Sequence, residues 1–313
     1  MLVRQTGKIS SNVALIARGT QCNYGVISEK NLLIDSCHSF EVNGLLKKLL
    51  EVEIDPKTLF GIALTHLHPE KVAGLITIKE RFPEIKIIAT QKMEGILSSE
   101  DFLANLRNSD EIAAQTAGTE SLLQEKSISD LRAILSPSIV IREGELIHLS
   151  KDCTIRVIAM PGHTDHSVAY LVQPNQVLVT DEGAGYFKLK GFTANGGDQS
   201  IEENLKSLQR IETLEISALA LPHHGAITGN LIRRHLKTVQ EYTAGMLAEC
   251  KEAFTLNMSE EEIFVGLRGA FYSDETLDNI SQLSISRSLD SIWSQIKNLK
   301  TQESLEQREE PTN

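Results

Sequence analysis

Six of the nine histidines in this 313-residue chain fall in three short segments, each directly after an apolar, strand-like stretch. The segments cover residues 64–71, 160–166 and 221–225, and a fourth strand-like stretch ends in an acidic pair at residues 181–182. Imidazole and carboxylate groups are the ligands that suit zinc, iron or manganese. A rigid sheet can deliver such ligands from distant strand ends to one cation. The clustering therefore predicts a metal site at one edge of a sheet.

The spacing within each segment allows its histidines to reach a shared ion. His66 and His68 are separated by one residue, and on an irregular loop both rings can turn towards one cation. Pro161 and Gly162 break the preceding strand, so that His163 projects from the edge of a loop. Isolated histidines, such as His148 and His235, are expected at the surface or in packing. The candidate ligands are His66, His68, His163, His166, Asp181, Glu70 and the pair His223 and His224.

Two types of element must position these residues. Apolar, β-branched runs bounded by turn residues predict strands, and apolar residues at helical spacing predict helices at residues 40–52, 72–81 and 201–211. Strands that alternate with helices indicate an α/β fold. The predicted strands cover residues 12–17, 24–28, 31–35, 59–64, 84–89, 138–141, 145–149, 154–159, 168–172, 177–180 and 216–221.

Two regions depart from this alternation. One is rich in Ser, Asn, Gln, Glu and Ala with leucines at helical spacing, which predicts a helical insertion; the other, near the C-terminus, is dominated by helical patterns. Within the second region, Ser259 and Glu262 have the spacing of a capping box. The expected divisions are a body at residues 1–228, a helical insertion within it at 91–136, a helical region at 229–300 and a flexible tail at 301–313.

The composition excludes some partners. With a formal net charge of −11 and a sequence pI of about 5.4, the chain lacks the basic footprint that nucleic-acid binding requires. The four cysteines are scattered and predict reduced core thiols. No apolar run has the length of a signal peptide or a membrane span. We therefore expect a cytoplasmic protein with a small-molecule substrate and neither a nucleic-acid nor a membrane partner.

The order and setting of these segments resemble the metallo-β-lactamase superfamily over residues 10–229. The superfamily signature Thr-His-x-His-x-Asp-His-x-Gly-Gly is matched at residues 65–74, and shorter motifs are matched by PGHT, VLVTDE and PHHG. The resemblance implies an αββα sandwich with a dinuclear metal site at one edge. It also implies that His66, His68 and His163 bind the first metal, that Asp181 bridges the ions, and that His224, or the adjacent His223, serves the second.

Two residues of the expected second site depart from the signature. Glu70 stands where the pattern has aspartate, and its carboxylate could still ligate a metal or act as a base through water. Lys71 stands where the pattern has histidine, and an ammonium cannot ligate and repels a nearby cation. We expect a weakened second site, and hence one or two ions, unless His166 or His223 compensates. Lys71 could instead turn outward, or stabilise a substrate oxyanion.

The resemblance implies hydrolysis, because a bound cation lowers the pKa of water from about 15.7 towards roughly 7 and yields a metal-bound hydroxide at neutral pH. Asp181 would orient that hydroxide, with Glu70 and Lys71 as further catalytic candidates. The two helical regions resemble the layout of thioesterase, lactonase and quinolone-signal-response members, which favours a small ester or thioester as substrate. One alternative is a non-catalytic or regulatory protein with a degenerate metal site. Another is a non-haem iron oxidoreductase.

Side chains of the insertion could set specificity, although ordinary helix packing is the more frequent role of such residues. Residues shortly after Asp181 could contact an acyl group or an anionic carrier. An amphipathic stretch at residues 280–299, with Trp293, could pack on the body or form a homodimer. The specificity candidates are Phe102, Leu103, Leu106, Leu122, Leu123 and Leu131 in the insertion, and Tyr186, Phe187, Lys188 and Lys190 after Asp181.

Overall fold

The computed structural model describes residues 1–186, 200–256, 258–259, 261–262 and 265. The predictions made for Phe187, Lys188, Lys190, the 280–299 stretch and the 301–313 tail lie outside these residues. The chain divides into two compact units, which are described separately. The first unit comprises Met1–Ala159, His166–Asp181 and Glu215–Ile232, and the second comprises Met160–Asp165, Glu182–Leu214 and Arg233–Asn313.

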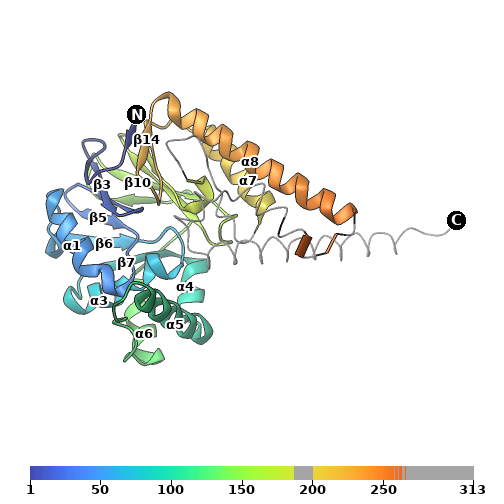
Figure 1. The fold of residues 1–313 in the computed structure, drawn as a ribbon. Helices are drawn as coiled ribbons and strands as arrows, with labels where there is room; N and C mark the ends of the chain where they lie inside the picture. The colour runs from blue at the N-terminus through green and yellow to red at the C-terminus, as the bar shows by residue number, and fades with distance from the viewer. Residues whose placement is uncertain (187–199, 257, 260, 263–264, 266–313) are drawn as a thin grey trace. The chain divides into compact units, whose positions relative to one another are not determined.

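The first unit contains two seven-stranded sheets (Figure 1). One has the order β2-β3-β4-β5-β6-β7-β8 and becomes parallel from β5 onward, whereas the other has the order β1-β14-β13-β12-β11-β10-β9 and is parallel only between β12 and β13. The strands of the first sheet are β2 (Gly7–Lys8), β3 (Val13–Arg18), β4 (Gln21–Val26), β5 (Asn31–Ile34), β6 (Leu59–Ala63), β7 (Lys86–Thr90) and β8 (Ile139–Ile141). Those of the second are β1 (Leu2–Val3), β9 (Leu146–His148), β10 (Thr154–Ala159), β11 (Val168–Gln173), β12 (Val177–Val179), β13 (Ala218–Ala220) and β14 (Ala226–Thr228).

The two sheets share one hydrophobic core, to which both contribute buried side chains. Four successive residues of β3 are fully buried, because a strand covered on both faces needs apolar side chains on both. The helices α1 (Val42–Glu51) and α3 (Gly74–Arg81) pack on the first sheet, and both bury apolar residues (Figure 1). The predicted αββα sandwich is therefore confirmed.

The predicted helical insertion forms three helices, α4 (Gln91–Leu97), α5 (Glu100–Thr116) and α6 (Ile128–Leu135). Each begins at a Thr or Ser whose side chain accepts a backbone N–H of the first turn, as such caps normally do. Among the six specificity candidates of the insertion, Leu122 is exposed and Phe102 is half-buried. The other four, Leu103, Leu106, Leu123 and Leu131, are buried core residues, in agreement with a packing role.

One buried carboxylate ties the insertion to the loop after β5. Asp110 of α5 is fully buried and accepts hydrogen bonds from the side chains of Ser39 and Ser121 and from the backbone N–H of Ser39. The Nδ1 atom of His38 lies 3.0 Å from its Oδ1 atom. Burial alone would raise the pKa of Asp110, but the hydrogen bonds from His38, Ser121 and Ser39 outweigh it and hold the pKa below its usual value. The carboxylate is thus ionised in the folded protein at neutral pH.

The second unit includes the α-helices α7 (Ile201–Glu212) and the greater part of α8 (Asn230–Thr255). Two contacts show that these helices run antiparallel. Glu212, near the end of α7, binds Gln240, and Glu202, near the start of α7, binds Lys251, which comes later in α8. The Ser259–Glu262 capping box is confirmed by hydrogen bonds in both directions. Among the described residues, no helix combines the length and apolar character needed to span a bilayer.

Replacing Asp110 with asparagine is expected to lower the free energy of unfolding by about 2 kcal/mol at pH 7, because two hydroxyl donors lose their ionised acceptor. The lowered pKa means that this contribution is fully present above the unfolded-state value of about 3.9 and is lost as pH falls through the folded-state value. Urea unfolding of both proteins between pH 7 and pH 3 tests this.

The exposed Asp101 in the first turn of the same helix provides the control. Asp101→Asn should cost less than about 1 kcal/mol at any pH. A stability difference between wild type and Asp110→Asn that stays constant down to pH 3 would contradict the role assigned to the carboxylate.

Candidate metal centre

The segment that carries His66 and His68 leaves the sheet at the end of β6 and is held on two sides. The hydroxyl of Tyr170 donates to the carbonyl of Leu64 at 2.7 Å, and the backbone N–H of Val168 donates to the carbonyl of Thr65 at 2.9 Å. His68 is then the N-cap of α2 (Pro69–Val72), where Pro69 at the first helical position fixes the direction of the chain. The two histidines thus sit on backbone that neighbouring strands immobilise.

Asp35 at the end of β5 determines which nitrogen of His66 can bind a metal. The Asp35 carboxylate accepts the Thr65 backbone N–H and the Thr65 hydroxyl, both at 2.7 Å. A hydroxyl has one proton, so the Thr65 oxygen, 3.0 Å from His66 Nδ1, must act there as acceptor. His66 Nδ1 therefore carries the imidazole proton, and Nε2 presents its lone pair for coordination. Such an outer hydrogen bond is usual for metal-ligating histidines.

His163 lies in the turn that follows β10. Gly162 before it has φ +141°, a conformation in which a side chain is strained, so the Pro-Gly pair does reshape the strand end as the sequence predicts. His163 is buried, with 3% of its surface exposed. The turn therefore directs the imidazole into the protein.

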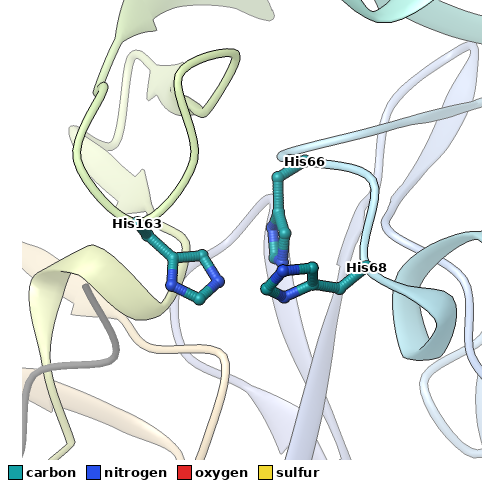
Figure 2. A group of neighbouring side chains, drawn as sticks. All are labelled: His66, His68 and His163. Atoms are coloured by element: carbon teal, nitrogen blue, oxygen red, sulfur yellow. The ribbon is translucent and has the colours of Figure 1, made fainter. Parts of the chain in front are cut away.

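The three predicted histidine ligands lie together (Figure 2). His66, His68 and His163 each offer one ligand atom, and these atoms lie within 4.8 Å of one another. The rings of His66 and His68 are nearly perpendicular, with centroids 4.6 Å apart. Figure 2 shows all three rings facing a common space. Three converging imidazoles are the donor set of many zinc centres.

Two glutamates complete this cluster, and the sequence analysis identified only one of them. A second group of potential ligands, also within 4.8 Å of one another, consists of His66, Glu70 and Glu182. Glu182 is 2% exposed, and its Oε2 atom lies 3.5 Å from Nε2 of His163. Two ligands at about 2.1 Å from a tetrahedral zinc ion lie about 3.4 Å apart. The separation therefore fits two ligands of one ion.

Glu70 places its carboxylate beside the histidines despite its extra methylene. Its Oε1 atom lies 3.9 Å from His68 Nδ1, and the side chain is about one-quarter exposed. The carboxylate is thus available to a metal or to water at the site.

Lys71 is buried, with 2% of its surface exposed, so the alternative in which it turns outward is wrong. Its backbone carbonyl accepts the N–H of Ser36 at 2.8 Å, which fixes α2 against the loop after β5. Burial raises the pKa of the Cys22 thiol to about 11, and a hydrogen bond with Gly225 and the charges of Lys71 and Arg18 oppose this rise.

The turn with His223 and His224 is fixed by hydrogen bonds to its backbone. The hydroxyl of buried Tyr24 lies 2.6 Å and 3.1 Å from the carbonyl oxygens of Leu221 and Gly225 at the two ends of the turn. His224 has φ 63°, and its N–H donates to Thr20. Both imidazoles are half-buried, and their centroids lie 6.4 Å apart.

Four predicted ligands do not belong to the two groups that the structure assembles from its described residues. They are Asp181, His166, His223 and His224. Asp181 is fully buried at the end of β12, directly before Glu182 in the short helical turn η3 (Glu182–Ala184). The sequence contained the signal for Glu182, since the strand VLV is followed by Thr and then by two acids, but a choice between adjacent acids requires the path of the backbone.

Comparison with known proteins agrees with this geometry. The sequence profile of the metallo-beta-lactamase superfamily matches residues 17–223. The chain therefore belongs to this superfamily, whose members bind divalent metals and are typically metal-dependent hydrolases.

One sequence relative and two solved structures are similar to most of this chain. The uncharacterized protein YobT of Bacillus subtilis (strain 168) is 25% identical over 215 residues, which cover 64% of this chain and 82% of YobT. A metallo-beta-lactamase family protein from Thermus thermophilus superposes with a TM-score of 0.61 at 17% identity, covering 93% of this chain and 95% of that protein. An archaeal superfamily protein from Sulfolobus tokodaii gives 0.57 at 20% identity, with 91% and 99% covered.

Replacing Thr65 with valine is expected to weaken binding of Zn²⁺ by about 10- to 100-fold while the fold is retained, because His66 loses the group that fixes its tautomer. Chelator competition measures the affinity. Thr77→Val, at a buried threonine of α3, is the control and should bind Zn²⁺ as tightly as wild type. An unchanged affinity in Thr65→Val would refute the Asp35–Thr65–His66 arrangement.

Proposed function

We propose that the protein is a metal-dependent hydrolase of a small ester or thioester. The observation that carries this proposal is the convergence of His66, His68 and His163 within 4.8 Å. When bound, a divalent ion, either zinc or iron and with manganese as an alternative, would supply an acidified water and polarise the substrate oxygen. The net charge of −11 favours a small substrate over nucleic acid.

We assign the acidic ligand to Glu182 rather than to Asp181. Glu182 belongs to a ligand group with His66, and its carboxylate lies 3.5 Å from His163 Nε2. The three histidines are neutral ligands in this role, so Glu182 supplies the negative charge that partly balances a divalent cation in a buried site. Asp181 then supports the turn from its buried position beside Glu182.

Glu70 and Lys71 act on the substrate side in this proposal. The partly exposed Glu70 carboxylate accepts a proton from water and returns it to the leaving group, as a general base and then a general acid. The Lys71 ammonium holds the carbonyl oxygen or a carboxylate of the substrate. Its fixed positive charge also disfavours a second divalent ion nearby, so the centre binds one metal.

Hydrolysis of generic chromogenic esters and thioesters, with and without added Zn²⁺, Mn²⁺ or Fe²⁺, tests the activity. Metal should stimulate turnover, and His68→Ala should lower kcat/KM by about 100-fold or more, since a ligand is lost. His148→Ala, at an exposed histidine of β9, should leave kcat/KM unchanged.

Bound metal without any turnover would instead favour a non-catalytic, ligand-binding role. Iron in the protein as isolated, with oxygen-dependent spectral changes, would favour the oxidoreductase alternative.

Metal stoichiometry tests the role of Lys71. Protein purified without chelator and then saturated with Zn²⁺ should contain close to one equivalent, and Lys71→His, which introduces the residue typical of the superfamily, should raise this towards two. Elemental analysis after gel filtration gives the numbers. Two tightly bound equivalents in the wild-type protein would show that Lys71 does not replace the second ion.

A further inference from the structure

One face of α7 carries polar side chains that the proposed chemistry does not use. Ser200 is the N-cap of this helix, and Asn204 and Ser207 follow at spacings of four and three residues, which places all three along one face. Asn204 is 0% exposed and Ser207 is 2% exposed. Burying an amide and a hydroxyl costs free energy unless both make hydrogen bonds. The hydrogen-bond partners of Asn204 and Ser207 therefore account for their buried positions.

This face of α7 first contacts the turn before His163. The hydroxyl of Ser207 donates to the carbonyl of Pro161 at 2.7 Å, and the backbone N–H of Ser200 donates to the carbonyl of Gly162 at 3.0 Å. Gly162 also lies against the helix, since a Cβ atom there would be 2.4 Å from the Cα atom of Asn204. The residues that direct His163 therefore rest on α7 without room for a side chain.

The turn η3, which contains Glu182, is contacted both by this face of α7 and by α8. The side-chain amide of Asn204 donates to the carbonyl of Gly183 at 3.1 Å. The imidazole Nε2 of His235, from α8, lies 2.8 Å from the carbonyl oxygen of Ala184, and His235 is 1% exposed. The carbonyls of the two residues after Glu182 are thus each held by a buried side chain of a helix.

His235 acts here as a neutral donor. Burial lowers its pKa to about 4, although the bond to Ala184 opposes the shift, so the ring is uncharged at neutral pH. Because a carbonyl only accepts, the single ring proton lies on Nε2.

We propose that Asn204 and His235 are positioning residues that set the distance between His163 and Glu182. This inference rests on the proposed function, since it takes His163 and Glu182 as ligands of one metal. Both ligands lie on short irregular turns, which have little structure of their own to fix the 3.5 Å separation of Nε2 and Oε2. Asn204 contacts both turns, so one helix fixes both positions, and His235 anchors the far end of η3.

Zinc affinity of variants tests the proposal, and the comparison includes a rescue. His235→Leu removes the donor, whereas His235→Gln keeps an N–H at nearly the same place. His235→Leu and Asn204→Leu should each weaken Zn²⁺ binding by about 10- to 100-fold in chelator competition, and His235→Gln by less than about 3-fold. The visible spectrum of bound Co²⁺ should change in the leucine variants and stay like wild type in His235→Gln, because it reports ligand geometry.

Asn12→Leu provides a matched control. Asn12 is buried, and its side-chain amide donates to the backbone carbonyl of Gln173, the last residue of β11. Gln173 pairs with Thr154 at the start of β10, whereas His163 follows the end of that strand. This variant should lose stability in urea unfolding of the metal-free protein yet keep the wild-type affinity for Zn²⁺. It separates general destabilisation from loss of ligand position.

The outcomes distinguish the two proposals. If the wild-type protein binds no Zn²⁺, or His66→Ala binds as tightly as wild type, the metal centre and the positioning roles both fail. If wild type binds but the two leucine variants match it, or weaken no more than Asn12→Leu, the positioning roles alone are overturned. If Asn204→Leu does not fold, the His235→Leu and His235→Gln pair decides.

Discussion

The rest of the candidate metal centre depends on the two hydrogen bonds that the carboxylate of Asp35 accepts from Thr65. This carboxylate accepts both the N–H and the hydroxyl of Thr65 and thereby fixes the first residue beyond β6 and, through the hydroxyl, the tautomer of His66. Asp35 can do this because it follows β5 directly and has the unusual φ of 59°. Parallel pairing of β5 with β6 brings the two strand ends together, so the site follows from the sheet topology.

A second constraint is the balance of buried charge. Two carboxylates and one ammonium, from Glu70, Glu182 and Lys71, lie within or next to the histidine segments, and two of the three are almost fully buried. Buried charges persist only when they are compensated. In a centre with two divalent ions the ions would provide that compensation. In the one-metal centre that we propose, the ammonium of Lys71 stands in place of a histidine, so less metal charge is needed to balance the two carboxylates.

The sequence predicted the fold and the cluster of three histidines because both leave strong local patterns. Runs of buried β-branched residues mark the long strands, and His66, His68 and His163 follow breaks in those runs. The short strands β1, β2 and β14 were missed because they pair through backbone groups alone and show no periodicity. Glu182 was not predicted as a member of the cluster for a related reason: adjacent acids at residues 181 and 182 look equivalent until the backbone turns at η3.

The contacts that α7 and α8 make with the turn η3 were the least predictable part of the structure, because they are made to backbone carbonyl groups. His235 seemed an ordinary packing histidine, and Asn204 was one polar residue in an amphipathic helix, because their partners are carbonyl oxygens of Gly183 and Ala184. Every residue has a backbone carbonyl, so the residue type of the partner does not indicate the contact. Recognition of these two carbonyls does not depend on the side chains of residues 183 and 184, whereas residue 162 must be glycine beside Asn204. For the contacts with η3, the identity that must be preserved is then that of the helix side chains, and only a three-dimensional structure shows which ones they are.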